Sequence, residues 1–269
     1  MLKQRIITAL ILAPVVLAGV FLLPPVAFAV FIGVIILIGA WEWAGLSGFQ
    51  GWQRYSYALV LMPMLVCAWF APATPILIAG LIWWILALWL VASYGSRRHL
   101  PDSIWLKALL GPLVLVPAWV GLLQLKLQPD STYLISLLFF LIWGADIGAY
   151  FAGRAFGRHK LAPDVSPGKT WEGVAGGLLM AVVIYILMDA GYGTYQMFSQ
   201  GWLLALLACV FIVLLSVLGD LTESLFKRER GIKDSSALLP GHGGILDRID
   251  SLVAAAPVYS LLFLFLLPR

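Results

Sequence analysis

Long apolar blocks separated by short polar segments recur along the 269-residue chain. Between Arg5 and Glu42 lie 36 residues without a formal charge, and between Asp189 and Asp220 lie 30. Each interval exceeds the ~20 residues that an α-helix needs to cross a bilayer. Blocks of this kind predict nine helices, at residues 5–23, 26–47, 56–71, 74–94, 104–124, 132–153, 171–188, 202–220 and 252–267.

The composition indicates a membrane protein. Hydrophobic residues make up 62% of the chain and charged residues 11%, whereas a soluble domain is about half apolar and about a quarter charged. The apolar blocks are unbroken rather than alternating, which excludes a transmembrane β-barrel. We therefore predict an all-α, polytopic integral membrane protein with about nine transmembrane helices. It divides into an N-terminal membrane region of about five spans (1–130) and a C-terminal catalytic region of about four spans with polar loops (131–269).

The first apolar block also has features of a signal peptide. Lys3 and Arg5 precede it, and Ala27-Phe28-Ala29 resembles a signal-peptidase site. However, the apolar run from Ile6 to Leu23 is longer than a usual signal core, and Pro24-Pro25 fits a turn between two spans. We expect this segment to be retained as the first span, with cleavage as the alternative.

Lysine and arginine are unevenly distributed over the predicted topology. With the N-terminus inside, 15 of the 17 fall in interior segments, and only Lys126 and Arg269 fall outside. Because cytoplasmic loops carry an excess of these residues, we expect a cytoplasmic N-terminus, cytoplasmic polar loops and an exterior C-terminus. The net charge of +4 is modest, so no nucleic-acid partner is indicated. No histidine is near a cysteine in the sequence, which argues against a Cys/His zinc site.

The charged residues are concentrated in two segments. Residues 146–172 and 220–250 hold 18 of the 30 charged residues. A cytoplasmic position of these two segments accounts for their lysines and arginines, but it does not require their aspartates and glutamates. Asp146 is also about seven residues inside the cytoplasmic end of its helix, where a carboxylate is expensive and indicates function. The alternative is an ion pair with Arg154 or Lys169 that holds helices together.

Carboxylates recur at helical spacing near the predicted ends of two helices. Asp220, Glu223, Ser224 and Lys227 follow the i, i+3, i+4, i+7 pattern of one helix face, and Asp247 and Asp250 are also three residues apart. Two helix ends that offer carboxylates at one membrane surface suit a hard cation such as Mg²⁺. The alternative interpretation is ordinary surface charge.

Two glycine-containing turns have the character of phosphate sites. Pro240-Gly241-His242-Gly243-Gly244 immediately precedes a predicted helix, where backbone N–H groups favour an anion. Ser166-Pro167-Gly168-Lys169-Thr170 has the same character before the seventh helix. Nearby cations would strengthen phosphate binding; they are Lys227, Arg228, Lys233 and Arg248.

The segment from Ser224 to Asp250 resembles the signature of the phosphatidate cytidylyltransferases (CDP-diacylglycerol synthases). It reads SLFKR, four residues, KDSS, two residues, and LPGHGGILDRID. A second block, DIGAY from Asp146 and SPGKTWEG from Ser166, also resembles this family, although the family often has a lysine where this chain has Gly168. The resemblance is specific over about 105 residues, and the first 140 residues agree only as apolar spans.

The resemblance implies transfer of the cytidylyl group of CTP to phosphatidate, giving CDP-diacylglycerol and pyrophosphate. It implies a Mg²⁺-dependent enzyme, with a second metal ion as an option, in the bacterial inner membrane, and it suggests a homodimer. We expect the metal ligands to be Asp220 and Asp247, supported by Asp250 and Asp146. We expect phosphates to be held by Lys227, Arg228, Lys233, Arg248 and Lys169. Further substrate contacts are expected at Ser224, Ser166, Thr170, His242, Gly243, Gly244 and Asp234, with a purely structural role as the alternative for His242.

Two other functions fit parts of the pattern. A related lipid or polyprenol kinase or head-group transferase would have a similar architecture. An anion transporter would explain the intramembrane Asp146 with basic loops, but a transporter is expected to place charges near the midplane of two matching half-repeats. No repeat is visible in this sequence, and the charges lie near one surface.

Overall fold

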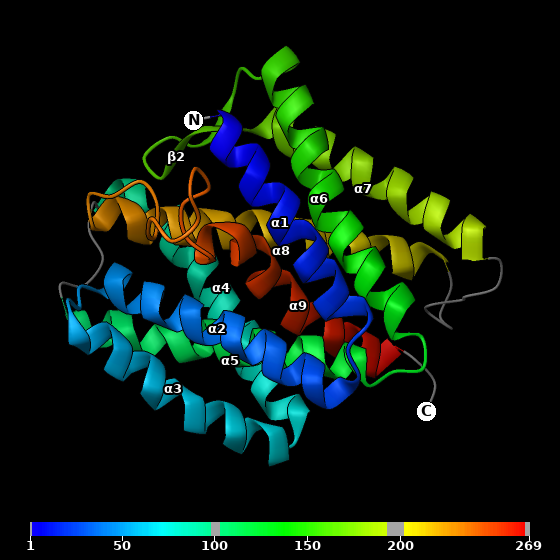
Figure 1. The fold of residues 1–269 in the computed structure, drawn as a ribbon. Coiled ribbons are helices and arrows are strands. Elements are labelled where there is room, and N and C mark those ends of the chain that lie inside the picture. The colour runs from blue at the N-terminus through cyan, green and yellow to red at the C-terminus, as the bar shows by residue number, and fades with distance from the viewer. Residues whose placement is uncertain (1, 98–102, 193–201, 267–269) are drawn as a thin grey trace.

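The computed structural model describes residues 2–97, 103–192 and 202–266. Nine helices form in these ranges, one at each predicted position (Figure 1). The all-α prediction is therefore confirmed. The helices are α1 (Leu2–Phe21), α2 (Pro25–Ser47), α3 (Trp52–Phe70), α4 (Ala73–Arg97), α5 (Ile104–Lys126), α6 (Ser131–Phe156), α7 (Trp171–Tyr192), α8 (Trp202–Glu229) and α9 (Leu246–Leu266).

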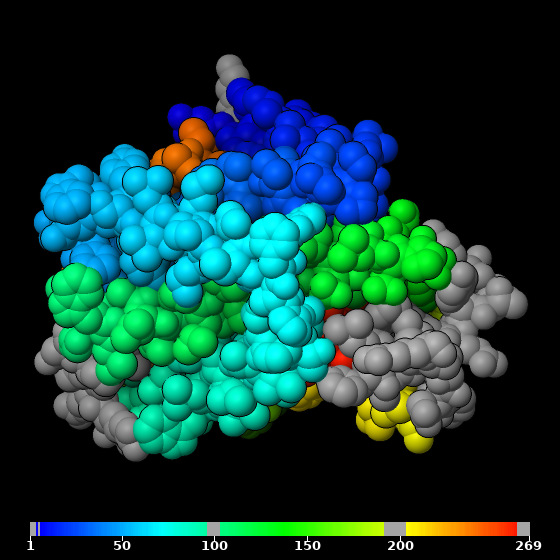
Figure 2. Space-filling view, turned by 90° about the horizontal axis from the view of Figure 1, so that it is seen from below, coloured from blue at the N-terminus to red at the C-terminus, as the bar shows by residue number. Residues whose placement is uncertain are grey.

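Most of these helices have the length and hydropathy of membrane spans. Within the described residues, six are long and apolar enough to cross a bilayer, namely α2, α4, α5, α6, α7 and α8. Large apolar side chains also remain on the surface, such as Leu59 and Phe70 of α3, which are 68% and 82% exposed. Figure 2 shows the face to which α2 to α5 contribute. A polytopic membrane protein is thus confirmed, while the number of nine spans stays a prediction.

Helices from both predicted regions pack into one bundle. The buried helix α5 contacts α2, α4 and α9, and α4 also contacts α8 and α9. The approach of α5 to α9 is close, because a Cβ added at Gly121 would lie 2.8 Å from the carbonyl oxygen of Ala256. The helices of residues 1–130 therefore share a core with those of residues 131–269.

Among the described residues, helices α6 and α7 form the most extensive helix pair, and small residues allow their close approach. Figure 1 shows how the two helices are arranged. A Cβ at Gly148 would lie 2.5 Å from the carbonyl oxygen of Gly176, and one at Gly177 would lie 2.8 Å from that of Ala145. Close backbone approach at small residues is typical of helix pairs in membranes. This pair carries Asp146 on α6 and places the segment between α6 and α7 at the end of the bundle.

The structure differs from the sequence prediction in one loop and at the start of α9. The segment between α6 and α7 is an antiparallel hairpin of β1 (Lys160–Ala162) and β2 (Ser166–Thr170). Helix α8 continues nine residues past Asp220, as its charge spacing suggested, and α9 begins at Leu246 rather than at residue 252. Arg98 and Arg269, both counted in the charge asymmetry, lie outside the described residues.

Candidate active site at the ends of α6, α8 and α9

A buried ion pair of the site joins α8 to α9. Lys227 Nζ lies 2.7 Å from Asp247 Oδ1, and the two side chains are only 12% and 5% exposed. Asp247 Oδ2 accepts hydrogen bonds from the backbone N–H groups of Ser235 (2.9 Å) and Gly244 (2.7 Å) and from the Ser235 hydroxyl (2.9 Å). Both carboxylate oxygens of Asp247 are therefore bound by groups of the protein itself.

A second lysine–aspartate pair joins β2 to α8. Lys169 Nζ lies 2.7 Å from Asp220 Oδ2, and these side chains are 24% and 34% exposed. Ser224, one turn along α8, donates its hydroxyl to Asp220 Oδ1 at 3.2 Å. The β-hairpin thus brings Lys169 to the face of α8 that the i, i+4 spacing predicted.

Three further carboxylates complete the cluster. Glu223 lies beside Asp250, and Lys227 reaches Glu223 Oε1 at a longer distance of 3.5 Å. Asp250 and Asp146 each lie close enough to Asp220 for their charges to repel. The cluster therefore holds five carboxylates against two lysines, an excess of negative charge that a bound cation would relieve.

The metal prediction can be compared with the donor arrangement. Among the described residues, no three Asp, Glu, His or Cys side chains converge as a preformed metal site. Magnesium does not require such a cage, because it is usually bound by one or two carboxylates together with substrate phosphates. Asp220 and Asp146 suit this role best, since Asp220 is partly exposed and Asp146 opens into a cavity. The metal-ligand roles of Asp220, Asp247, Asp250 and Asp146 all stay predictions.

The loop between α8 and α9, residues 230–245, is shaped by its glycines. Gly241 and Gly243 have φ values of 77° and 80°, which residues with a Cβ rarely adopt. A Cβ at Gly243 would also lie 2.6 Å from Asp247 Oδ2. The turn was predicted to close on a phosphate, but in this structure the N–H of Gly244 binds Asp247 instead. Phosphate contacts at Gly243 and Gly244 remain a prediction.

A buried carboxylate that the sequence analysis did not assign to the site also holds this loop. Glu42 of α2 is 0% exposed and accepts hydrogen bonds from Ser236, Ile245 and Leu246. It is the only acidic residue before Asp102, and an acid inside an apolar span is itself a sign of function. That signal was present in the sequence, but its partners are about 200 residues away.

Several predicted site residues have structural contacts outside the cluster. The Thr170 hydroxyl accepts from the N–H of Gly173 at 3.1 Å and so caps α7, which accounts for this buried residue without a substrate. Ser166 is half-buried and pairs with Ala162 in the hairpin. Arg228 donates to the carbonyl of Val165 at 3.1 Å and ties α8 to the same hairpin.

The remaining predicted residues lie in or beside the loop. Lys233 and Asp234 are exposed, and no hydrogen bond or ion pair among the described residues joins either of them to the carboxylates of the cluster. Arg248 donates to the carbonyl of His242 at 3.1 Å. The buried His242 Nδ1 has no hydrogen-bond partner among the described residues, which leaves it available to a ligand.

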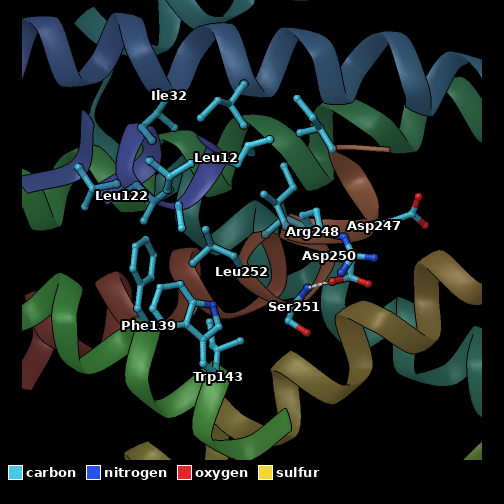
Figure 3. Close-up of a pocket in the computed structure, with 18 of the residues that line it drawn as sticks. Leu12, Ile32, Leu122, Phe139, Trp143, Asp247, Arg248, Asp250, Ser251 and Leu252 are labelled. Atoms are coloured by element: carbon cyan, nitrogen blue, oxygen red, sulfur yellow. Dashed lines mark hydrogen bonds between the residues drawn. The ribbon is translucent and has the colours of Figure 1, made fainter. Parts of the chain in front are cut away.

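An apolar cavity of about 540 Å³ opens onto this cluster. Helices α1, α2, α5, α6 and α9 line it. Figure 3 shows Leu12, Leu122 and Phe139 around its apolar part, while Arg248 and Asp250 lie at its polar end. The site therefore combines a cluster of charged groups with a compartment suited to hydrocarbon.

Comparison with known proteins agrees with this combination. The model of the Cytidylyltransferase family matches residues 3–266. The chain is 51% identical over 265 residues to a phosphatidate cytidylyltransferase of Pseudomonas aeruginosa, with 97% of each chain covered. It is 39% identical over 288 residues to one of Haemophilus influenzae (99% of this chain, 100% of the relative) and 37% identical over 274 residues to one of Brucella suis (98% and 93%).

Proposed function

The chain belongs to the cytidylyltransferase family, and from this membership we propose that the lysines and carboxylates between α6, α8 and α9 form its active site. Its function is the transfer of the cytidylyl group of CTP to phosphatidate, giving CDP-diacylglycerol and pyrophosphate. The observation that carries the placement is the apolar cavity that ends at charged groups. One substrate of this reaction is a lipid, and the other is a soluble polyanion.

In the proposed mechanism, an oxygen of the phosphatidate phosphate attacks the α-phosphorus of CTP. The bond from that phosphorus to the oxygen bridging the α- and β-phosphates breaks, and pyrophosphate leaves with this oxygen. A phosphate monoester has a second pKa of about 6, so the nucleophile is mostly ionised near neutral pH and needs no strong general base. The protein must therefore orient the two substrates in line and neutralise charge.

The two lysines of the cluster are placed for this neutralisation. Lys169 is partly exposed beside Asp220, and Lys227 is held beside Asp247. We propose that Lys169 contacts substrate phosphate and that Lys227 keeps Asp247 and the α8–α9 loop in place. Arg248 and His242 line the mouth of the cavity, where they would meet the phosphate of phosphatidate. Lys233 and Arg228 would add positive potential at the loop.

The donor types fit a divalent cation. Five carboxylates face two lysines, and the buried Glu223 lies beside the carboxylate of Asp250 with Lys227 only at 3.5 Å. A Mg²⁺ ion bound by Asp220 and Asp146, with Asp250 in support, would neutralise the leaving pyrophosphate. We propose metal dependence on these grounds.

We further propose that the polar end of the cavity faces the cytoplasm and that the protein resides in the inner membrane of a bacterium. The distribution of lysine and arginine supports this orientation. Single cysteines at positions 230 and 127, in a background lacking Cys67 and Cys209, test it in intact cells. We expect an impermeant thiol reagent to label position 127 and not position 230. The reverse labelling would be incompatible with a cytosolic CTP site.

We place an acyl chain of phosphatidate in the cavity. From Thr8 to Val20, both of which line it, α1 rises about 18 Å, roughly half of the ~30 Å hydrocarbon thickness of a bilayer. The cavity thus has the depth of one leaflet. A Leu122→Trp substitution would fill its apolar end, and Leu59→Trp makes the same change on the exposed face of α3.

We expect Leu122→Trp to lower kcat/KM for a long-chain phosphatidate about tenfold, because each methylene that loses burial costs about 0.8 kcal/mol. Turnover of dihexanoyl phosphatidate should change less than about twofold, and Leu59→Trp should affect neither substrate. Equal losses with both chain lengths would remove the acyl chain from this cavity.

Incubation of the purified protein with CTP, phosphatidate and Mg²⁺ tests the proposed active site and its metal dependence together. We expect pyrophosphate and CDP-diacylglycerol in equal amounts, and no product after chelation of divalent cations. Full turnover in the presence of a chelator would remove the metal from the proposal. Full turnover by a Lys169→Gln variant would remove Lys169 from the phosphate site.

A further inference from the structure

Glu42 makes an unusual set of contacts for a residue in an N-terminal span. Its carboxylate accepts hydrogen bonds from the Ser236 hydroxyl at 2.6 Å and from the backbone N–H groups of Ile245 at 2.9 Å and Leu246 at 2.6 Å. The Ser235 hydroxyl lies 3.3 Å from Glu42 Oε2, the oxygen that also accepts from Leu246. All four donors belong to the α8–α9 loop or to the first residue of α9.

These contacts explain how a carboxylate can be buried at this position. A buried charge is costly unless nearby groups compensate it. Arg54 of α3 lies close enough to attract Glu42, although among the described residues it makes no ion pair with it within 4 Å. The start of α9 supplies the direct hydrogen bonds, since the N-terminus of a helix has free N–H groups and a positive dipole end. Glu42 therefore caps α9 from a different helix.

The same contacts connect Glu42 to the active site. The Ser235 hydroxyl lies 2.9 Å from Asp247 Oδ2 and 3.3 Å from Glu42 Oε2, so it stands between two carboxylates. Gly244 permits this arrangement, because a Cβ there would collide with both Ser235 and Glu42. The backbone N–H of Gly244 in turn binds Asp247. Movement of Glu42 would thus displace two of the donors that fix Asp247.

We infer that Glu42 is a positioning residue for the cytidylyl transfer, acting through Ser235 and the start of α9 on the orientation of Asp247 towards Lys227. This inference rests on the proposed active site. It assigns a role to the N-terminal half of the chain, which otherwise contributes apolar spans and a cavity wall. Glu42 itself does not touch the substrates.

The test compares two glutamate-to-glutamine variants in the full-length protein. Glu42→Gln keeps the size of the side chain but turns an amide N–H₂ towards N–H donors. Glu229→Gln makes the same change at another buried carboxylate, which is 5% exposed and accepts from the Tyr94 hydroxyl at 2.8 Å, outside the α8–α9 loop. Purified protein in detergent micelles is assayed for turnover, for the KM of CTP and for the melting temperature.

We expect Glu42→Gln to lower kcat about ten- to a hundredfold, the size of a lost hydrogen bond to a charged group. The KM for CTP should change less than about threefold, because Glu42 does not contact it. Glu229→Gln should keep kcat within about twofold of the wild type. If the melting temperature falls equally in Glu42→Gln and Glu229→Gln but kcat falls only in Glu42→Gln, the loss of kcat does not come from loss of stability.

A double-mutant cycle tests the route of the effect. Ser235→Ala should cost much less in a Glu42→Gln background than in the wild type, because both changes disturb the same carboxylate. If Glu42→Gln does not fold, Ser236→Ala removes a single donor to Glu42, and we expect a three- to tenfold loss of kcat at unchanged KM for CTP.

Two outcomes would overturn the inference. One is a Glu42→Gln or Ser236→Ala protein with unchanged kcat per folded molecule, which would make Glu42 only an anchor of the bundle. The other is strict additivity with Ser235→Ala. Failure of the proposed active site would look different, because then Lys169→Gln and Asp220→Asn would also leave turnover unchanged.

Discussion

The two lysine–aspartate pairs of the site have the same length but different surroundings. Lys227 and Asp247 are 2.7 Å apart and almost completely buried, and both Asp247 oxygens are bound by protein donors. Lys169 and Asp220 are also 2.7 Å apart, yet both are partly exposed, and within the described part of the chain only Ser224 adds a hydrogen bond. The first pair is preorganised, whereas the second can exchange its partner for a ligand.

This difference separates support from binding within one cluster. A buried pair with fixed donors holds helices α8 and α9 and the loop between them at defined positions. An exposed pair can open when substrate phosphate or a cation competes for it, at a small cost because water already screens it. Substitutions in each pair and in the neighbouring loop test this contrast.

The largest effect is expected for Asp247→Asn. Loss of this charge leaves Lys227 buried without its partner, and breaking one side of a buried pair costs about 3–5 kcal/mol. We expect turnover to fall at least a hundredfold and the melting temperature to drop, with membrane insertion retained. Kinetics and thermal unfolding of the purified variant measure both. Near-wild-type activity would show that the buried pair does not support the site.

A different profile is expected for Asp220→Asn. Because this side chain is partly exposed, its loss should leave the melting temperature within about 2 °C of the wild type, as expected for a surface substitution. Turnover should fall about ten- to a hundredfold, and a higher Mg²⁺ concentration should recover part of it, since one ligand charge is lost. A Mg²⁺ titration of both aspartate variants checks the contrast. Equal destabilisation by both would contradict it.

The smallest effect is expected at the exposed loop cation Lys233. Water and salt screen such a charge, so Lys233→Gln should raise the KM for CTP only about two- to fivefold, with a smaller effect at higher ionic strength. The matched change Arg230→Gln removes an exposed charge from the same loop and should alter the KM less than about twofold. If both substitutions change the KM for CTP equally, Lys233 contributes only to the orientation of the protein in the membrane.

The helices, the membrane class and the two segments rich in charged residues could be predicted from the sequence alone. Helix positions depend on local hydropathy, and helical spacing puts Asp220, Ser224 and Lys227 on one face independently of the tertiary contacts of the helix. The motif around Asp247 is also a local feature, because its residues are contiguous in the sequence.

The donors that each carboxylate receives follow from packing in three dimensions. Glu42 meets its partners across 193 to 204 positions of the chain, and Lys169 reaches Asp220 through a hairpin that hydropathy did not indicate. Such contacts depend on how helices pack, a property of the whole bundle that no local pattern encodes. For the same reason, the sequence did not show that the N–H groups of Gly244 and Ile245 bind Asp247 and Glu42, while phosphate contacts of the glycine turn stay a prediction.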